Sequence, residues 1–435
     1  MSTLRLAVRG PLDALDAGAR RVLFDRAGAG GRAVRERTGQ IIDRVRAEGD
    51  AALVALSREF DGVEDLTLEV PRELWRAALA ALDPALRHAL ERAARNIRQV
   101  HEAFRPVASE VTTADGIVIG RRPDPLGRVG VYAPGGRATY PSSLLMGVIP
   151  ARVAGVGEII VCSPPGRDGV PSQVLLAAAE LADADRVFAV GGAGAIAAMA
   201  FGTATIPAVD RIVGPGNAYV AEAKVQVSSV TAIDSPAGPS ELLIIADEGA
   251  SAEVLAGELL AQAEHDPMAA VVLISTSEAL LDAVERRLAD RIPLEPRAQI
   301  IATALADRGA LLLAGSLAEA VSFSNQWAPE HLLVATREPD ALVPSLRNAG
   351  TIFVGEYASV SFGDYMSGAN HVLPTGGTAR GYSGLSTIDF CRWTTWQRIG
   401  RDAAAALASD TGVFADAEQL PAHAAAARYW SGGNR

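Results

Sequence analysis

Arg128-Val129-Gly130-Val131-Tyr132-Ala133 decides the fold, because this short apolar run opens a series of strands that alternate with alanine-rich helices. The sequence predicts strands at residues 128–133, 158–162, 186–190 and 211–213, each followed by a helix, at residues 142–154, 172–182, 193–201 and 217–227. Strands that are separated by single helices pair in parallel through right-handed crossovers. We therefore expect a doubly wound sheet with ligands at the carboxyl ends of its strands.

The same alternation returns between residues 241 and 354. Strands are predicted at residues 241–246, 270–275, 310–314, 332–335 and 351–354, with helices at residues 251–264, 278–290 and 317–326. The predicted fold class is α/β, with two doubly wound, incomplete Rossmann-like domains that face a cleft. Small helical segments are expected at both ends of the chain. The C-terminal one is too small for a strong core, so we expect it to dock on another surface.

Two further helical patterns, at residues 33–61 and 84–104, carry apolar stripes and are interpreted as scaffold. His88 and His101 in the second of them are interpreted as surface residues. Residues 116–120 are predicted to form a strand, and residues 123–127, which contain two prolines and a glycine, a turn.

Composition limits the class of protein. The chain has 435 residues, of which 49% are hydrophobic, and a formal net charge of −11. This acidic balance argues against nucleic acid or an anionic membrane as the main partner, and it favours a soluble enzyme that binds small molecules. Cys162 and Cys391 lie far apart, so neither a zinc ribbon nor a disulfide framework is indicated. No apolar run has the length of a membrane span, and we expect a cytoplasmic protein.

The end of the predicted helix at residues 251–264 has the pattern of half a metal site. Ser251 is a candidate N-cap, and Pro267 prevents the helix from continuing. Gln262 and His265 are one turn apart and therefore project from the same face. The alternative is that His265 only interacts with the carbonyl end of the helix dipole and that Glu264 is solvated.

Two other segments combine carboxylates with imidazoles. Glu330 and His331 are adjacent and offer two groups for proton transfer near neutral pH. From these two residues alone, a surface glutamate beside a buried histidine at a strand start is the better interpretation. Residues 363–377 form a loop dense in glycine, in which Asp364 and His371 are candidate donors to a metal or a substrate. The alternative is an ordinary glycine-rich connection.

Several weaker patterns stay open. Glu418 and His423 place a carboxylate and an imidazole five positions apart in the tail. The proline-rich loop at residues 235–241 either holds Ser240 against a ligand or makes a turn. Gly192 and Gly194 fit a dinucleotide fingerprint only superficially, since small residues in an alanine-rich helix produce such matches by chance. The turn at residues 214–217 can present backbone N–H groups to pyrophosphate.

Taken together, these segments resemble the histidinol dehydrogenase family along nearly the whole chain. The resemblance is carried by six motifs in order, at residues 130–136 (GVYAPGG), 214–220 (GPGNAYV), 236–241 (PAGPSE), 262–267 (QAEHDP), 328–332 (APEHL) and 370–377 (NHVLPTGG).

The resemblance implies a zinc- and NAD-dependent enzyme that oxidises L-histidinol through the aldehyde to L-histidine, the last step of histidine biosynthesis. It also implies a homodimer in which the small C-terminal domain reaches into the partner's site. The implied domains are an N-terminal segment at residues 1–28, an α/β domain at residues 29–130 and 240–384 that carries the metal and acid–base residues, a nucleotide-side domain at residues 131–239, and a C-terminal helical domain at residues 385–435.

The resemblance also assigns roles to individual residues. His331 is implied to be the base that takes the alcohol proton, and Glu330 to activate water for the aldehyde step. The implied zinc ligands are Gln262, His265, Asp364 and His423. The implied substrate contacts are Ser240, His371 and Glu418, together with His331 and the four zinc ligands. The implied cofactor contacts are Tyr132, Gly194 and Asn217.

Gly194 departs from the family pattern, because the family usually has a glutamine there that touches NAD. This departure leaves open a paralogue that oxidises another polar alcohol, such as a sulfopropanediol. A catalytically silent binding protein is the alternative of a different class, and the retained Glu330–His331 pair argues against it. The sequence does not show which subunit supplies Glu418 and His423.

Overall fold

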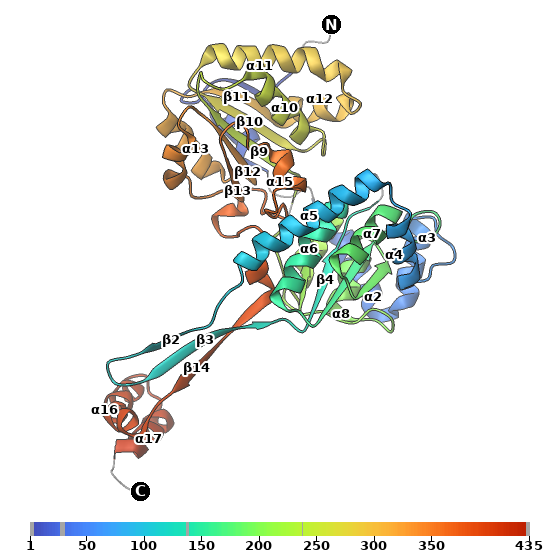
Figure 1. Ribbon diagram of the computed structural model, residues 1–435. Helices are drawn as coiled ribbons and strands as arrows, with labels where there is room; N and C mark the ends of the chain where they lie inside the picture. The colour runs from blue at the N-terminus through green and yellow to red at the C-terminus, as the bar shows by residue number, and fades with distance from the viewer. Residues whose placement is uncertain (1–3, 27–30, 136–138, 237, 432–435) are drawn as a thin grey trace. The chain divides into compact units, whose positions relative to one another are not determined.

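A computed structural model describes residues 4–26, 31–135, 139–236 and 238–431, which form two compact units (Figure 1). The main unit comprises Met1–Phe104 and Leu126–Phe390. The C-terminal unit comprises Arg105–Pro125 and Cys391–Arg435. Gly136 and Ala237, which belong to two of the quoted motifs, lie outside the described residues.

A five-stranded parallel sheet forms one half of the main unit in the part of the chain that the structure describes. Its strand order is β6-β5-β4-β7-β8. The strands are β4 (Arg128–Tyr132), β5 (Glu158–Ser163), β6 (Arg186–Ala189), β7 (Arg211–Val213) and β8 (Ala232–Ile233), and the connecting helices are α6 (Pro141–Ala154), α7 (Gln173–Ala182), α8 (Gly192–Phe201) and α9 (Ala218–Val227). The predicted strand–helix alternation is confirmed. Glycine permits close packing of the helices on β4, since a Cβ on Gly130 would lie 2.4 Å from Met199 Sδ of α8.

The N-terminal helices pack on this same half. They are α2 (Arg32–Glu48), α3 (Asp50–Phe60), α4 (Arg72–Ala80) and α5 (Pro84–Ala103). Helix α2 contacts α8 and α9, α4 contacts α7, and α5 contacts α6. Residues 32–103 therefore contact the helices of the five-stranded half. The apolar stripes of these helices are predictable, but the sheet that they cover is not, because a stripe does not specify its partner.

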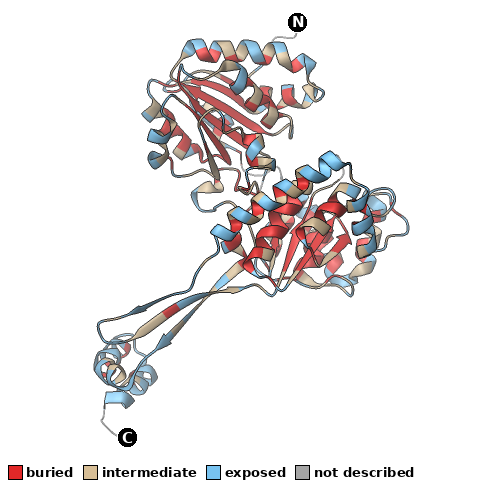
Figure 2. Cartoon of the chain, viewed as in Figure 1, coloured by how far each residue is buried: buried red, intermediate tan, exposed pale blue. Residues whose placement is uncertain are grey.

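A six-stranded parallel sheet forms the other half, with strand order β1-β11-β10-β9-β12-β13. The strands are β1 (Val8–Pro11), β9 (Glu241–Ala246), β10 (Ala270–Ser275), β11 (Gly309–Leu313), β12 (His331–Ala335) and β13 (Thr351–Val354). The helices are α10 (Ala252–Ala263), α11 (Glu278–Arg291), α12 (Ala298–Arg308), α13 (Leu317–Trp327), α14 (Pro339–Leu342) and α15 (Val360–Tyr365). Every residue of β9 and β10 is buried, as expected for parallel strands covered on both faces (Figure 2). The N-terminal segment contains the expected helix as α1 (Ala17–Phe24) and also adds β1 to this sheet.

The C-terminal unit contains an antiparallel sheet as well as helices. Strand β3 (Val118–Pro125) pairs with both β2 (Ser109–Thr112) and β14 (Cys391–Arg398). Helices α16 (Arg401–Ala417) and α17 (Pro421–Arg428) follow β14. The predicted turn at residues 123–127 was therefore wrong, because residues 123–125 belong to β3. The predicted C-terminal helices are present as α16 and α17. Pro123 and Pro125 lie beyond the residues of β3 that pair with β2, where one edge of the strand is free and proline is tolerated.

His101 is buried, with 1% of its surface exposed, which corrects its interpretation as a surface residue. It lies on α5, where its carbonyl oxygen accepts a hydrogen bond of 2.8 Å from the Thr387 hydroxyl. Burial lowers the pKa of the His101 imidazole to about 4. Protonation of His101 is therefore unfavourable in the native protein. The periodicity of the sequence did not indicate that this histidine is buried.

We expect His101 to make the protein less stable in mild acid. The unfolded chain binds a proton near pH 6.5 and the native state only near pH 4, so the free energy of unfolding falls as pH drops through this window. The loss is at most roughly 3 kcal/mol. Urea unfolding at pH 7.5 and pH 5 measures it, and His101→Leu should reduce the difference. Replacement of the exposed His88 on the same helix is the control and should leave the difference unchanged.

Candidate active site

The Glu330–His331 pair lies at the start of β12, and one residue of the neighbouring strand holds both side chains. The backbone N–H of Glu241 donates to Glu330 Oε2 at 2.7 Å. His331 Nδ1 donates to the carbonyl oxygen of Glu241 at 2.9 Å. His331 Nε2 has no hydrogen-bond partner among the described residues and lies 3.7 Å from Asp364 Oδ1. The Nδ1 bond fixes the ring orientation and leaves Nε2 available for proton transfer.

Carboxylates dominate the electrostatics of this pair. Burial alone would lower the pKa of His331, but the charges of Glu330 and Asp364 outweigh burial and raise the pKa well above its usual value. Burial would raise the pKa of Asp364, yet nearby imidazoles lower it, chiefly His331 and then His371 and His265. The site therefore favours the charged forms of His331 and Asp364.

The Glu241 side chain is anchored by a buried ion pair. Its carboxylate contacts the Arg26 guanidinium and accepts a hydrogen bond of 2.8 Å from the Gly376 N–H. Arg26 lies over the Trp327 ring, 3.6 Å from its centroid, and donates to the Trp327 carbonyl oxygen. Burial raises the pKa of Glu241 to about 7 although Arg26 opposes the shift. Arg26 therefore connects the strand that holds the acid–base pair to the end of α13.

Replacement of Arg26 by methionine should destabilise the protein by about 3–5 kcal/mol, because it leaves the Glu241 carboxylate buried without its partner. The double variant Arg26→Met with Glu241→Gln should recover part of this loss, since both charges are then absent. Thermal unfolding of the two variants measures the difference. Equal losses in both would contradict the structural role of the ion pair.

Two of the predicted zinc ligands, Gln262 and Asp364, lie on helices that a hydrogen bond joins, and a third, His265, follows one of these helices. Gln262 is buried in the last turn of α10, and His265 follows the helix end. Asp364 lies on α15. Glu258 Oε2 of α10 accepts a hydrogen bond of 3.1 Å from Val360 N–H, the first residue of α15. This bond joins the two helix segments, but among the described residues no three His, Cys, Asp or Glu side chains gather as a preformed metal site.

His371 is fixed at both ring nitrogens. Its Nδ1 donates to the carbonyl oxygen of Asp364 at 2.8 Å, and its Nε2 lies 3.2 Å from the Ser143 hydroxyl of α6. Burial lowers the pKa of His371. The contacts bring a residue of the five-stranded half beside the Asp364 segment. Ser240 directly precedes β9 and is half-buried.

Glu418 and His423 belong to the C-terminal unit. Glu418 caps the end of α16 and His423 lies on α17, and both side chains are exposed. Each therefore presents its donor atoms at the surface of that unit.

The predicted cofactor contacts lie in the five-stranded half. Tyr132 is buried, and its hydroxyl accepts a hydrogen bond of 3.1 Å from the Gly192 N–H. Gly194 is also buried, and a Cβ there would lie 3.2 Å from Leu56 Cδ1. The Asn217 side chain caps α9 by accepting from the N–H groups of Tyr219 and Val220. Of these three residues, Asn217 lines a pocket.

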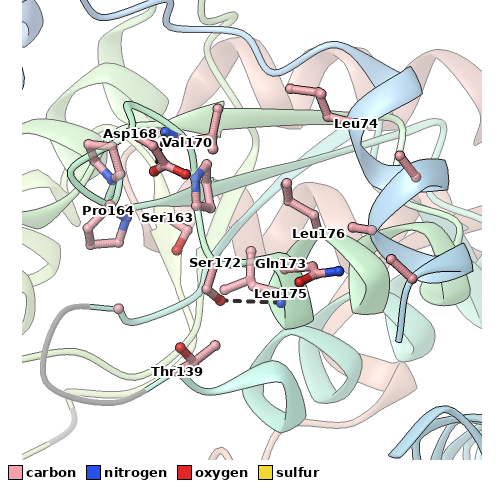
Figure 3. A pocket seen from close by; sticks show the side chains of 17 residues that line it. Leu74, Thr139, Ser163, Pro164, Asp168, Val170, Ser172, Gln173, Leu175 and Leu176 are labelled. Atoms are coloured by element: carbon pink, nitrogen blue, oxygen red, sulfur yellow. Dashed lines mark hydrogen bonds between the residues drawn. The ribbon is translucent and has the colours of Figure 1, made fainter. Parts of the chain in front are cut away.

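That pocket, of about 540 Å³, is lined both by a predicted cofactor contact and by residues next to predicted substrate contacts. Its lining includes Asn217 from the α9 end, Pro239 beside Ser240, Asp266 beside His265, and Thr375 and Gly376 from the glycine-rich loop. A second pocket, of about 450 Å³, lies at the carboxyl end of β5 between α4 and α7 (Figure 3). None of the predicted site residues lines the second pocket.

The two sheets place their predicted sites at opposite strand ends. Tyr132 and the turn that follows β7 lie at carboxyl ends, as expected. Glu241 and His331 are instead the first residues of β9 and β12. The acid–base pair therefore lies at the amino ends of strands in the six-stranded sheet.

Comparison with known proteins gives the family. A sequence profile described as histidinol dehydrogenase matches residues 25–430. The histidinol dehydrogenase of Methanosarcina barkeri is 46% identical over 402 residues, covering 92% of this chain and 93% of that protein, and that of Halobacterium salinarum is 49% identical over 407 residues, covering 93% and 95%. The chain belongs to the histidinol dehydrogenase family. A crystal structure of the histidinol dehydrogenase from Elizabethkingia anophelis, 33% identical, has a TM-score of 0.93 and covers 99% of this chain and 98% of that chain.

Membership of the histidinol dehydrogenase family makes the chain an oxidoreductase and confirms the recognised resemblance and fold class. The matched range includes Arg26 and the C-terminal unit up to residue 430. Sequence reasoning missed Arg26, Ser143, Glu241 and Glu258. Glu241 was treated only as a strand start, and Arg26, 215 residues away, gives no local signal of its role.

Proposed function

We propose that the protein oxidises L-histidinol to L-histidine through the aldehyde, with NAD as hydride acceptor and one zinc ion per subunit, as the last step of histidine biosynthesis in the cytoplasm. The observation that carries this proposal is the buried Glu330–His331 pair, held by the backbone of Glu241 beside Asp364. Family membership supports the substrate class.

His331 is proposed as the base of both oxidation steps. Its Nδ1–H is committed to the Glu241 carbonyl, so in the neutral imidazole Nε2 is the atom that accepts the hydroxyl proton while hydride leaves the same carbon for NAD. The carboxylates of Glu330 and Asp364, which raise the pKa of His331, stabilise the imidazolium that forms. Glu330 Oε2 is committed to the Glu241 N–H, while Oε1 makes no hydrogen bond to a described residue. We assign Oε1 to the activation of water, which converts the aldehyde to the gem-diol required for the second hydride transfer.

Zinc is proposed to be held by Gln262, His265, Asp364 and His423. One amide oxygen, two imidazoles and a carboxylate suit this metal, and Glu258 ties the two helices that carry Gln262 and Asp364. When bound, zinc orients the amine and imidazole of the substrate and compensates the Asp364 carboxylate. Ser240, His371 and Glu418 are proposed to bind substrate with these residues.

The cofactor is proposed to lie toward Asn217, in the 540 Å³ pocket that also borders the Ser240 and His265 segments. The buried Tyr132 and Gly194 are then proposed to shape the wall behind the cofactor through the start of α8.

A homodimer with shared sites is proposed, in which His423 of the partner subunit completes the metal site. Exposed apolar side chains of the C-terminal unit support a surface that is covered in the assembly, among them Val413, Phe414 and Trp430. Phe362 and Tyr365, which flank Asp364, are also exposed by more than half. No described helix is long and apolar enough to cross a bilayer.

Zinc-loaded protein incubated with NAD and either L-histidinol or a sulfopropanediol tests the substrate. We expect NADH from L-histidinol and none above background from the sulfonate. NADH from the sulfonate alone would instead identify the paralogue that Gly194 leaves open. No NADH from either alcohol would favour the catalytically silent protein.

A further inference from the structure

Lys224 is the only lysine among the 40 lysine and arginine residues of the sequence. It lies on α9 and is almost fully buried, with 1% of its surface exposed. Lysine is rarely buried unless its ammonium group is paired. A chain that otherwise uses arginine throughout therefore keeps a lysine at one enclosed position.

Three oxygen atoms surround the Lys224 ammonium group. Nζ forms an ion pair with the Asp234 carboxylate, which is also buried. It donates to the carbonyl oxygen of Gly214 at 3.1 Å and to that of Ser235 at 3.3 Å. Asp234 Oδ2 in turn accepts a hydrogen bond of 2.8 Å from the Gly214 N–H. The pair thus binds the N–H and the carbonyl group of Gly214 and the carbonyl group of Ser235.

The two peptides belong to the segments that border the 540 Å³ pocket. Gly214 follows β7 and leads to Gly216 and Asn217, which line the pocket. Ser235 leads through Pro236 and Pro239, which also line the pocket, to Ser240 and Glu241. Lys224 therefore connects the proposed cofactor turn to the segment that carries the proposed substrate contact and the residue that holds Glu330 and His331.

Arginine does not replace lysine at this position. An ammonium group is compact and directs three N–H groups tetrahedrally, which matches three acceptors around one point. A guanidinium group is planar and larger. Gly214 is itself restricted to glycine, because its φ is +115° and a Cβ there would lie 2.1 Å from the Tyr132 carbonyl oxygen.

We propose that Lys224, paired with Asp234, is a positioning residue. It holds the turn at residues 214–217 and the segment that leads from Ser235 to Ser240 at a fixed separation, so that the nicotinamide ring stays aligned with the reacting carbon. This inference rests on the proposed function. It assigns Lys224 no contact with substrate or cofactor, so its effect is on alignment rather than on proton transfer.

Two variants test the role. Lys224→Arg keeps the charge but not the three-acceptor geometry, and the double variant Lys224→Met with Asp234→Asn removes both charges without leaving either unpaired. We expect both, when zinc-loaded, to lose about 10- to 100-fold in kcat per folded molecule, because small misplacements of reacting groups have effects of this size. Zinc content should stay at the wild-type level.

Arg186→Met is the matched control. It breaks the ion pair of Arg186 with Glu69, also in the five-stranded half, at residues that do not line the pocket. We expect it to lower the melting temperature and to leave kcat and both KM values unchanged. If the Lys224 variants likewise keep wild-type kcat and KM per folded molecule, the positioning role is wrong.

A second readout needs no turnover. Because Lys224 is the only lysine, labelling with lysine carrying ¹³C at Cε gives one side-chain NMR signal in the wild-type holoenzyme. Addition of NAD should shift it, since the residues that follow Gly214 and Ser235 line the pocket. No response to NAD would overturn the proposal even if every variant fails to fold. NADH formation from L-histidinol by the wild-type protein is measured first. If no NADH forms, the proposed function is refuted. The response of the Lys224 NMR signal to NAD then still decides whether the positioning role is correct.

Discussion

Replacement of His331 by asparagine is expected to lower kcat by about 10²- to 10⁴-fold, the usual contribution of a general base. The asparagine amide can still donate to the Glu241 carbonyl, as Nδ1 does, so the local structure should persist. It offers no basic nitrogen at the position of Nε2, so the alcohol proton has no acceptor. Steady-state kinetics of the zinc-loaded variant measure the loss.

Metal analysis of the same variant separates two assignments of His331. We expect the zinc content to match that of the wild type, because His331 is proposed as a base and not as a ligand. Asp364→Ala, which removes a proposed ligand, is the comparison and should lose zinc. Loss of zinc from the His331 variant as well would mean that this residue had been assigned wrongly. His88→Asn, at an exposed position, should behave as the wild type.

Mixing two inactive variants is expected to restore activity if the subunits share their sites. Asp364→Ala and His423→Ala should each be inactive alone, since each removes one proposed zinc ligand. After subunit exchange, half of the dimers are mixed and each carries one intact site, so activity should reach about a quarter of the wild-type value. The mixture is assayed after exchange at several total concentrations.

The outcome distinguishes the two possible arrangements. If Asp364 and His423 of the same chain formed the site, every mixed dimer would carry one defect in each site and remain inactive. A mixture of Asp364→Ala with Gln262→Ala is the control, because both positions lie on the main unit. This mixture should stay inactive whether His423 comes from the same chain or from the partner. In both cases Asp364 and Gln262 of a site belong to one chain, so every site of a mixed dimer has one defect.

The sequence predicted the layered part of the fold well because its signals are local. Buried parallel strands such as β9 and β10 appear as continuous apolar runs, and the intervening helices have their own caps, such as Ser251 at α10. Pairings between distant segments were missed. Strand β3 pairs with β14 across about 270 residues, and nothing near residues 118–125 indicates this partner.

The same limit applies to the candidate site. The Gln262–His265 helix end and the Glu330–His331 pair could be selected from residue type and spacing. Their supporting contacts could not, because Glu241 acts through its backbone groups, which any residue possesses. Lys224 could have been noticed as the only lysine, but its role required the positions of Gly214 and Ser235.

The central claim is that one site carries an alcohol through both oxidation levels, with His331 as the base and Glu330 as the group that activates water. The most direct test is the number of NADH molecules formed for each L-histidinol consumed by the zinc-loaded enzyme at completion, with the product identified by mass spectrometry. The account predicts two NADH and L-histidine. One NADH with accumulation of the aldehyde would contradict it.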